Sequence, residues 1–144
     1  MQSQRRLHGS CASRNDEAVL ILGPSGSGKS DLVMRLLGRG FSLVADDQVE
    51  VADGLASPPP QLAGLLEVRG LGILRLAAVF PAPVRLIIQI GPRPERMPLP
   101  IMHPELALPV IQLDPSCVSA VDRVILALDC AAGRITQVAG AFAV

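Results

Sequence analysis

Aromatic residues are nearly absent from this chain of 144 residues, which has three phenylalanines and neither tryptophan nor tyrosine. The core must therefore be built from aliphatic side chains, and stacking of bases on aromatic rings is not expected as a way of binding single-stranded nucleic acid. A surplus of charge is also missing, because 13 basic residues balance 13 acidic ones. We therefore expect no general binding to nucleic acid, and any site for an anion has to be local.

Long apolar runs and paired cysteines are lacking as well. No stretch reaches the roughly 20 apolar residues of a membrane-spanning helix, and the two arginines near the N-terminus are not followed by the apolar run of a secretory signal. Cys11, Cys117 and Cys130 are widely spaced, which predicts reduced, buried thiols rather than a disulfide framework or a zinc site. We expect a cytoplasmic protein with no membrane contact and a single domain over residues 1–144.

The chain does have a regular order of apolar segments. Residues 18–22 form a short apolar run typical of a central parallel strand, residues 31–37 have helical spacing, and residues 41–45 predict a second strand. The β-branched run 84–90 predicts another strand. These segments together predict an α/β fold with a central mixed or mainly parallel sheet flanked by helices.

The remaining segments are less regular. Residues 53–64 contain three consecutive prolines and predict a surface connection, and residues 91–104 contain five prolines and predict a loop. Residues 106–113 are expected to form one more strand. The apolar run 118–128 is compatible with either a helix or a strand.

One glycine-rich segment lies between the first predicted strand and the helix. Its residues are Gly23, Pro24, Ser25, Gly26, Ser27, Gly28, Lys29 and Ser30. They match the spacing of a phosphate-binding loop (P-loop), in which glycines let successive N–H groups turn toward phosphate oxygens at a helix N-terminus. Lys29 supplies a full positive charge for the outer phosphates, and Ser30 supplies a hydroxyl for Mg²⁺. The segment therefore predicts a nucleotide site with Mg²⁺.

Two carboxylates, Asp46 and Asp47, follow the strand predicted over 41–45. In an open parallel sheet this is the edge at which ligands bind. If that strand neighbours residues 19–22, one carboxylate holds magnesium and the other takes a proton from a hydroxyl that attacks the γ-phosphate. The alternative is a pair of aspartates that only begins a turn.

Four other residues carry less information in isolation. Glu67 opens the segment Glu-Val-Arg-Gly-Leu-Gly, whose glycines allow a backbone to approach a ligand closely. A single histidine such as His8 is most often an ordinary surface or core residue, and Arg96 in its proline-rich loop is interpreted most simply as a solvated charge. His103 has no evident partner.

Taken together, four segments resemble the catalytic domain of HPr kinase/phosphorylase. They are His-Gly at 8–9, Gly-Pro-Ser-Gly-Ser-Gly-Lys-Ser-Asp at 23–31, Leu-Val-Ala-Asp-Asp at 43–47 and Leu-Glu-Val-Arg-Gly-Leu-Gly-Ile at 66–73. The resemblance implies an ATP- and Mg²⁺-dependent enzyme that phosphorylates a serine of HPr, the small carrier protein of the bacterial phosphotransferase system. Family members are typically homohexamers, and some also catalyse the reverse phosphorolysis of phosphoserine-HPr.

The resemblance also implies roles for individual residues. The metal ligands that it implies are Ser30, Glu67 and Asp46, and the catalytic residues are His8, Lys29, Asp47 and Arg96. Within this set, Asp47 corresponds to the base that receives the serine proton, and Arg96 corresponds to an arginine directed at the transferring phosphate.

The chain departs from the family in two places. Family members carry an additional domain before the histidine, whereas seven residues precede His8 here, so the chain resembles a short form with the catalytic domain alone. Residues 109–115 stand where the family has a segment tied to dephosphorylation, and they lack its arginines.

Two other functions stay open from the sequence. One is a non-catalytic regulator that senses ATP, and the other is a small-molecule kinase or a GTPase. No Asn-Lys-x-Asp segment for reading guanine occurs in the chain, which argues against an ordinary GTPase. Formation of phosphoserine on a carrier protein distinguishes the kinase from these alternatives.

Overall fold

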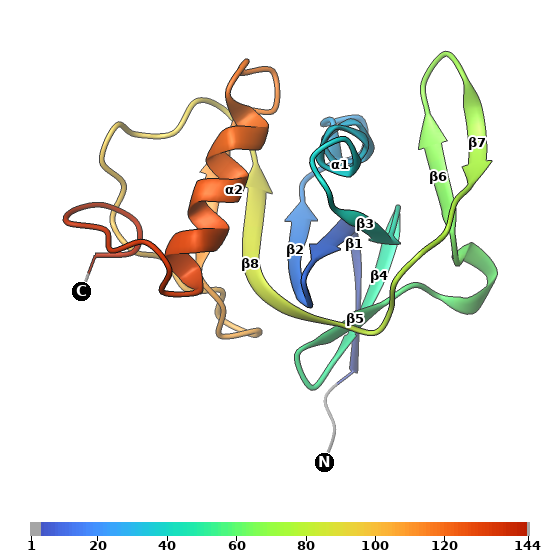
Figure 1. The fold of residues 1–144 in the computed structure, drawn as a ribbon, viewed down its shortest axis with the longest axis horizontal. Helices are drawn as coiled ribbons and strands as arrows, with labels where there is room; N and C mark the ends of the chain where they lie inside the picture. Colours follow the sequence, from blue (N-terminus) through green and yellow to red (C-terminus); the bar gives the residue numbers. More distant parts are fainter. Residues whose placement is uncertain (1–3, 144) are drawn as a thin grey trace.

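The computed structural model describes residues 4–143, and Figure 1 shows their arrangement. The strands are β1 (Gln4–Arg14), β2 (Glu17–Leu22), β3 (Ser42–Ala45), β4 (Gln48–Ala52), β5 (Leu55–Ser57), β6 (Leu65–Val68), β7 (Gly72–Arg75), β8 (Ala82–Ile90) and β9 (Val110–Leu113). The helices are α1 (Lys29–Leu37), the 3₁₀ helix η1 (Pro60–Leu62) and α2 (Ala120–Ala131). No helix in this described part is long and apolar enough to cross a membrane.

Seven strands form one mixed sheet around β1. β1 pairs antiparallel with β2 along one edge, and with β3 and then β4 along the other. β8 lies parallel to β2, and β9 lies parallel to β8. β2, β3, β8 and β9 therefore run in one direction and end at the same edge of the sheet, which is where open sheets bind ligands.

The same sheet curls until it closes on itself. β4 pairs with β5, β5 pairs with the first residues of β8, and β8 returns to β2. The mixed sheet predicted from the sequence is confirmed, whereas the mainly parallel alternative is wrong, because only the β2–β8 and β8–β9 pairings between these strands are parallel. A hairpin of β6 and β7 stands apart from this sheet (Figure 1).

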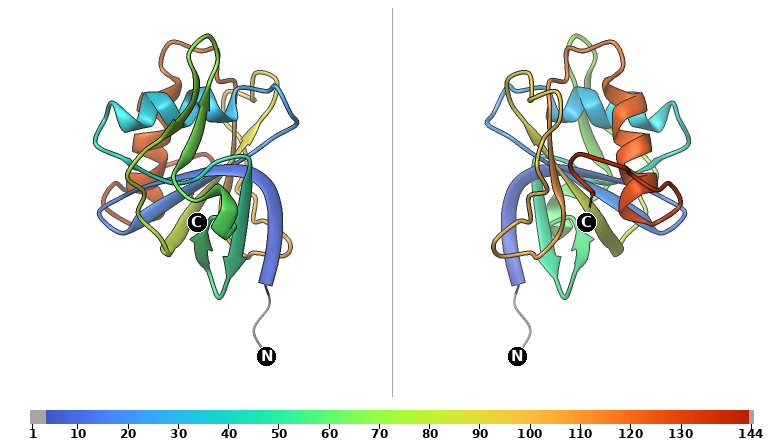
Figure 2. Two further views of the ribbon diagram at one scale, coloured as in Figure 1. Left: turned by 90° about the vertical axis from the view of Figure 1, so that its right-hand side faces the viewer. Right: turned by 90° about the vertical axis from the view of Figure 1, so that its left-hand side faces the viewer.

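Two groups of buried side chains lie on the two faces of the sheet. One group includes Leu32 and Leu36 of α1 together with Val124 and Leu128 of α2. The other consists of residues from β1, β2, β3, β4, β5 and β8 and lies inside the curl. Both helices thus cover the same face rather than flanking the sheet on two sides, and Figure 2 shows them on one side of the curled strands.

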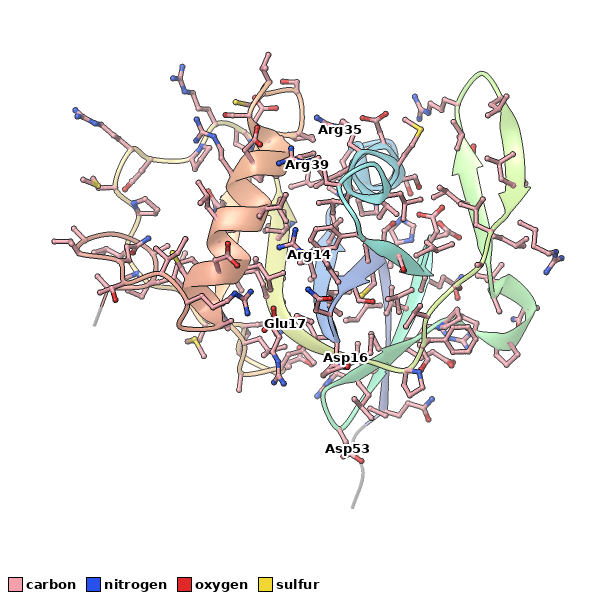
Figure 3. The ribbon with its side chains drawn as sticks, viewed as in Figure 1. Arg14, Asp16, Glu17, Arg35, Arg39 and Asp53 are labelled. Atoms are coloured by element: carbon pink, nitrogen blue, oxygen red, sulfur yellow. The ribbon has the colours of Figure 1, made fainter. Side chains whose placement is uncertain are left out.

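Polar contacts fix the helices relative to the rest of the fold. Arg39, two residues after the end of α1, donates a 3.0 Å hydrogen bond from Nη1 to Asp122 Oδ1 in α2. Arg134, which follows α2, donates two hydrogen bonds to the carboxylate of Glu17 at the start of β2. Figure 3 shows Glu17 beside the lower part of α2, and Arg39 between the two helices. The strand that leads into the glycine-rich segment is therefore anchored at its first residue.

Most of the predicted elements are confirmed. They are the strands expected over 18–22, 41–45 and 84–90, and the helix expected over 31–37. The ambiguous run 118–128 belongs to helix α2, and only the last part of 106–113 forms a strand, β9. The loop expected over 91–104 is confirmed, since the structure places no helix or strand in it.

The prediction that residues 53–64 are only a surface connection is wrong. Leu55–Ser57 forms β5 within the curled sheet, and Ala56 is fully buried. The three prolines at 58–60 come directly after the last residue of this strand, so they do not interrupt its hydrogen bonds. β1 has no counterpart among the predicted elements, because its first half is too polar to be distinguished from a surface segment.

The cysteines are free thiols. Cys11 is fully buried in β1, and burial raises the pKa of its thiol. Cys117 and Cys130 are partly exposed. The expectation of unpaired thiols is therefore confirmed, while the expectation of burial holds for Cys11 alone.

Candidate functional site

The segment between β2 and α1 curls at the ligand-binding edge of the sheet. Gly26 and Gly28 have φ angles of 76° and 103°, which glycine adopts without strain, and Gly28 caps α1. A Cβ on Gly23 would lie 2.8 Å from the Ser27 hydroxyl and 3.1 Å from the side chain of Ile90. The first N–H groups of an α-helix have no partner within the helix, so this curl presents donors to an anion.

Lys29 closes the loop from inside. Its Nζ donates hydrogen bonds of 2.9 and 2.8 Å to the carbonyl oxygens of Gly23 and Pro24. Burial lowers the pKa of Lys29, while the carboxylates of Asp46 and Asp47 act in the opposite direction. Neutral carbonyls do not compensate the charge of a buried ammonium, so an anionic group in the loop stabilises it.

A second buried polar group lies in the same loop. The Ser27 hydroxyl is buried and has no hydrogen-bond partner among the described residues. Buried polar groups are normally satisfied, so this loop holds both a buried ammonium and a buried hydroxyl whose bonding capacity is not used within the chain, which favours a ligand with many acceptor oxygens. A polyphosphate chain fits this description.

Asp46 lies beneath the loop, at the end of β3. Its Oδ1 accepts hydrogen bonds of 2.7 Å from the hydroxyls of Ser30 and Ser10. Its Oδ2 accepts the backbone N–H of Glu67 at 3.4 Å. One buried carboxylate therefore joins the first turn of α1, the middle of β1 and the strand β6.

The position of the aspartate pair follows from the pairing of β1. β3 pairs with Cys11–Ser13 and β4 pairs with Gln4–His8 along the same edge, so the pair lies where the partner strand changes. At this point the Gly9 N–H donates to the carbonyl oxygen of Asp47 at 3.1 Å. The predicted strand at 41–45 is not the neighbour of β2, because β1 lies between them. The two strands still run in the same direction, and both end at the site.

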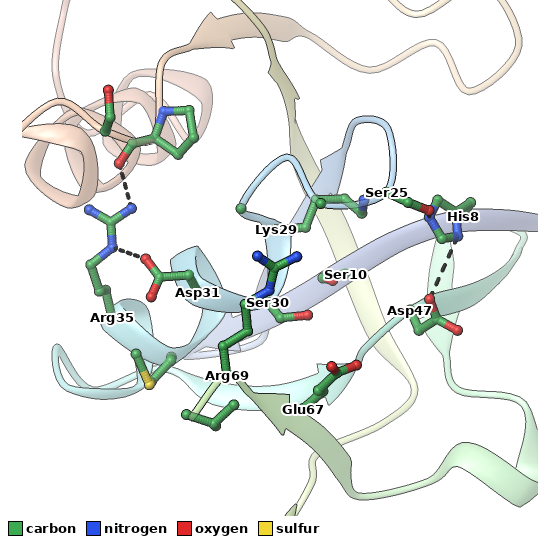
Figure 4. Close-up of a pocket in the computed structure, with 16 residues that line it drawn as sticks. His8, Ser10, Ser25, Lys29, Ser30, Asp31, Arg35, Asp47, Glu67 and Arg69 are labelled. Atoms are coloured by element: carbon green, nitrogen blue, oxygen red, sulfur yellow. Dashed lines mark hydrogen bonds and ion pairs between the residues drawn. The ribbon is translucent and has the colours of Figure 1, made fainter. Parts of the chain in front are cut away.

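Asp47 is exposed at the mouth of the site, with 64% of its side chain accessible. Its φ of 70° is left-handed, a conformation that aspartate adopts more readily than most residues. Its Oδ1 lies 3.7 Å from Nδ1 of His8, and Nε2 of the same ring lies 3.1 Å from the Ser25 hydroxyl. The imidazole therefore bridges the carboxylate and the glycine-rich loop (Figure 4).

Gly9 explains how His8 reaches this position. A Cβ on Gly9 would lie 2.7 Å from the carbonyl oxygen of Ile21, closer than real Cβ contacts allow. Glycine thus lets β1 approach the end of β2, where the loop begins. The pattern His-Gly in the sequence is a positional requirement of the site.

A cavity of about 550 Å³ opens over the loop. The predicted site residues that line it are His8, Ser25, Gly26, Gly28, Lys29, Ser30, Asp47 and Glu67. Gly23, Pro24 and Ser27 belong to the loop, and Asp46 is directly hydrogen-bonded to Ser30, although none of these four is among the lining residues. Arg96 lies in the loop 91–104 and does not line the cavity, so its role stays a prediction.

Residues to which the sequence assigned no individual role complete the walls, although three of them, Asp31, Val68 and Arg69, belong to the motif segments 23–31 and 66–73. They are Ser10, Asp31, Met34, Arg35, Val68, Arg69, Pro115 and Ser116. The guanidinium of Arg69 reaches over the loop to 3.6 Å from the position of a Cβ on Gly26. Arg69 lies in the turn directly after β6, two residues after Glu67, and this closeness in sequence to Glu67 was a usable signal. The turn that contains Pro115 and Ser116 carried no such signal.

The oxygen atoms around Asp46 suit a hard divalent cation. Ser30 and Asp46 are in contact, and the backbone of Glu67 adjoins Asp46 while its side chain faces the cavity. The part of the chain described contains no group of three or more His, Cys, Asp or Glu side chains that could hold a metal alone. This donor set fits Mg²⁺, which usually binds through one or two carboxylates together with substrate phosphates and waters.

Comparison with known proteins agrees with this geometry. The family described as HPr Serine kinase C-terminal domain matches residues 1–86. Similar curated proteins include an HPr kinase/phosphorylase of Bordetella petrii, 51% identical over 67 residues, and HPr kinase/phosphorylase 1 of Oceanobacillus iheyensis, 41% identical over 81 residues. The aligned parts are 43% and 53% of this chain but only 22% and 26% of the two relatives, so the chain matches about a quarter of their length.

A solved structure extends the similarity to most of the fold. It is the Hpr(Ser) kinase/phosphatase from Coxiella burnetii, with a TM-score of 0.70 and 25% sequence identity over 86% of this chain and 87% of that chain. The shared architecture therefore reaches beyond residue 86 toward β9 and α2. The α/β fold expected from the sequence is confirmed.

Proposed function

Because the chain belongs to the HPr Serine kinase C-terminal domain family, we propose that it transfers the γ-phosphoryl group of ATP to a serine of HPr or an HPr-like carrier protein. One observation carries this proposal. The cavity has a loop closed around the buried Lys29 ammonium on one side and the exposed carboxylate of Asp47 on the other. The names of the similar proteins supply the acceptor.

The loop supplies the donor site. On binding, Lys29 would exchange its bonds to the carbonyls of Gly23 and Pro24 for bonds to phosphate oxygens, which carry a full charge. The N-terminal N–H groups of α1 and the guanidinium of Arg69 add further positive potential around the phosphates. These groups stabilise charge that spreads over the transferring phosphoryl group.

Ser30, Asp46 and Glu67 are the residues that would hold Mg²⁺. When bound, Mg²⁺ neutralises charge on the outer phosphates and helps to orient them. Asp46 is fixed for this role by the hydroxyls of Ser10 and Ser30 and by the backbone of Glu67.

Asp47 is the residue that would receive the serine proton. The acceptor oxygen forms a bond to the γ-phosphorus, the bond from that phosphorus to the oxygen of ADP breaks, and the serine proton passes to the Asp47 carboxylate. His8 holds a position between this carboxylate and Ser25 of the loop. His8 is therefore a positioning residue that fixes the Asp47 carboxylate relative to the phosphate loop.

Exposure favours a macromolecular acceptor over the two alternatives. A kinase for a small molecule gains by enclosing its substrate away from water, whereas the Asp47 side chain is 64% accessible. A regulator that only senses ATP has no use for an exposed carboxylate held beside the phosphate loop. A serine on the surface of a folded protein can reach this carboxylate directly.

The family resemblance supports three further proposals. The first is that the chain acts in the cytoplasm. The second is that it assembles as a homo-oligomer, and we expect light scattering to give the molar mass of a hexamer. The third is reverse phosphorolysis at the same loop, the second activity named in both curated relatives, although residues 109–115 lack the arginines of the family segment tied to dephosphorylation. Pyrophosphate release from phosphoserine-HPr in the presence of inorganic phosphate tests that reaction.

The kinase proposal is tested by incubating the chain with ATP, Mg²⁺ and purified HPr of Bordetella petrii or Oceanobacillus iheyensis. We expect intact-mass spectrometry to show one added phosphoryl group and fragmentation to place it on a serine. Lys29→Ala should abolish the product. If the wild-type chain binds ATP but yields no phosphoserine on either carrier, the non-catalytic regulator becomes the better assignment.

A further inference from the structure

One end of the cavity has no role in the proposed binding of phosphates or in the proton transfer to Asp47. We call it the far end, and its residues are Met34, Arg35, Pro115 and Ser116. Figure 4 shows Asp47 and His8 at one side of the cavity, Lys29 and Ser30 between, and Arg35 at the opposite side. The phosphate loop therefore lies between two ends of one cavity.

The order of the strands produces this arrangement. Asp47 follows β3, the loop follows β2, and the turn with Pro115 and Ser116 follows β9. β3 and β9 lie on opposite sides of β2 in the sheet, and all three strands run in the same direction. Their ends thus form a row along one edge, with the phosphate loop in the middle.

The far end is joined to the loop and to α1 by close contacts. Arg35 Nη2 donates a 2.6 Å hydrogen bond to the carbonyl oxygen of Pro115, and Arg35 Nε lies 3.2 Å from the Asp31 carboxylate. The ring of Pro115 lies 3.3 Å from the position of a Cβ on Gly28. A ligand in the loop therefore has the turn after β9 as an immediate neighbour.

The exposed face of α1 forms the floor of the cavity from the loop to the far end. Asp31, Met34 and Arg35 follow one another at helical spacing on this face. From Lys29 to Arg35 the helix rises about 9 Å, which is longer than the reach of one phosphate group. Met34 is 38% exposed and presents apolar surface to the cavity.

We propose that the far end binds the nucleoside of the phosphoryl donor, with Met34 and Pro115 in contact with the base. The inference rests on the proposed function, because transfer requires the outer phosphate to face Asp47. A nucleoside triphosphate in that orientation extends across the loop to the opposite side. There the apolar surfaces of Met34 and Pro115 suit the faces of a base.

Most polar groups of the far end have hydrogen-bond partners within the chain, and the exception, the buried Arg35 Nε, lies 3.2 Å from the Asp31 carboxylate. Arg35 is bonded to Pro115, and the hydroxyl and N–H of Ser116 are both bonded to Asp114 Oδ1. The far end therefore contacts the base through its apolar surface, and its contribution is separate from that of the charged loop.

This separation defines the test. Isothermal titration calorimetry on the full chain with Mg²⁺ compares ATP with inorganic tripolyphosphate, which has the phosphates but no nucleoside. Met34→Ala removes apolar contact, and Ser116→Trp places a bulky ring at an exposed position in the far end. Met97→Ala is the matched control, because Met97 is 62% exposed and does not line the cavity.

We expect Met34→Ala to weaken ATP binding about fivefold and Ser116→Trp to weaken it at least about tenfold, with tripolyphosphate changed by less than about twofold in both. Met97→Ala should bind both ligands like the wild type. Equal losses for ATP and tripolyphosphate, or no loss for either, would overturn the nucleoside assignment. If ATP binding responds as expected while no carrier is phosphorylated, the far end stands and the proposed kinase function fails.

Discussion

The Ser30 hydroxyl donates a 2.7 Å hydrogen bond to Oδ1 of the Asp46 carboxylate. The same oxygen accepts a second 2.7 Å bond from the buried hydroxyl of Ser10 in β1. Asp46 therefore fixes the start of α1 to the central strand and keeps carboxylate oxygens beside the Ser30 hydroxyl, for which we propose binding to Mg²⁺.

Asp46→Ala should lower the free energy of unfolding by about 1–3 kcal/mol, because it leaves the Ser10 hydroxyl buried without an acceptor. Adding Ser10→Ala should recover part of this loss by removing the orphan hydroxyl. Urea unfolding of the wild type, Asp46→Ala, Ser10→Ala and the double variant measures both effects. A double variant that loses the full sum of the two single changes would show that the bond is not coupled in this way.

Asp47→Asn should lower the rate of phosphoryl transfer by about 10²–10⁴, since the amide cannot accept the serine proton. ATP affinity should stay close to that of the wild type, because Asp47 lies at the mouth of the cavity and not within the loop. The matched control is Asp53→Asn. Asp53 is also an exposed aspartate with positive φ, at 53°, but it lies in the turn between β4 and β5 and does not line the cavity. An equal loss of rate in both variants would remove the special role of Asp47.

Lys29 gives a pH dependence that is open to direct measurement, because it is the chain's single lysine. Its folded-state pKa lies below the ordinary 10.5, mainly through burial. Phosphate binding requires the charged form, so affinity for ATP should fall as the pH rises through this lowered pKa. The stability of the free protein depends on pH in the opposite direction. The folded state loses its proton first, so this group's contribution to stability rises with pH between the lowered pKa and 10.5.

Reductive methylation with ¹³C-formaldehyde labels Lys29 and the N-terminal amine, which titrate separately in NMR spectra. The Lys29 midpoint in the free chain should lie below the ordinary value, and MgATP should raise it. A midpoint at 10.5 that ATP leaves unchanged would place the ammonium away from the phosphates.

Glu17 and Arg134 provide a second pH dependence, distant from the site. The hydrogen bonds from Arg134 hold the pKa of Glu17 below its usual value of 4.5. The resulting stabilisation is present above pH 4.5 and disappears as the pH falls through the lowered pKa. Arg134→Gln should therefore reduce the loss of thermal stability on acidification, whereas Arg75→Gln, at an exposed position on β7, should not. Identical acid profiles for the wild type and Arg134→Gln would contradict the pairing.

The loop and the aspartate pair were predictable because each is specified by adjacent residues. Gly23 to Ser30 combine the glycines, the ammonium and the hydroxyl in one segment, and Asp46 directly follows a recognisable strand. The strand β8 was equally clear from its β-branched residues. Local sequence carries these features because their geometry is set by neighbours in the chain.

The rest of the site depends on which strands become neighbours. Ser10 contacts Asp46 only because the partner strand of β1 changes from β4 to β3 near this residue. Pro115 meets Gly28 only because β9 is added beside β8 at the end of the sheet. Such contacts join residues far apart in sequence, and neither serine nor proline has a spacing that marks it for this purpose.

The central claim is transfer of a phosphoryl group from a donor in the loop to a serine that reaches Asp47. It is tested most directly by a single-turnover reaction in which excess enzyme, ATP and Mg²⁺ are mixed with HPr and phosphoserine is counted by mass spectrometry. We expect phosphoserine at equal rates with the wild type and Asp53→Asn, a strongly reduced rate with Asp47→Asn, and none with Lys29→Ala. An undiminished rate with Asp47→Asn, or no phosphoserine from a wild-type chain that binds ATP, would contradict the claim.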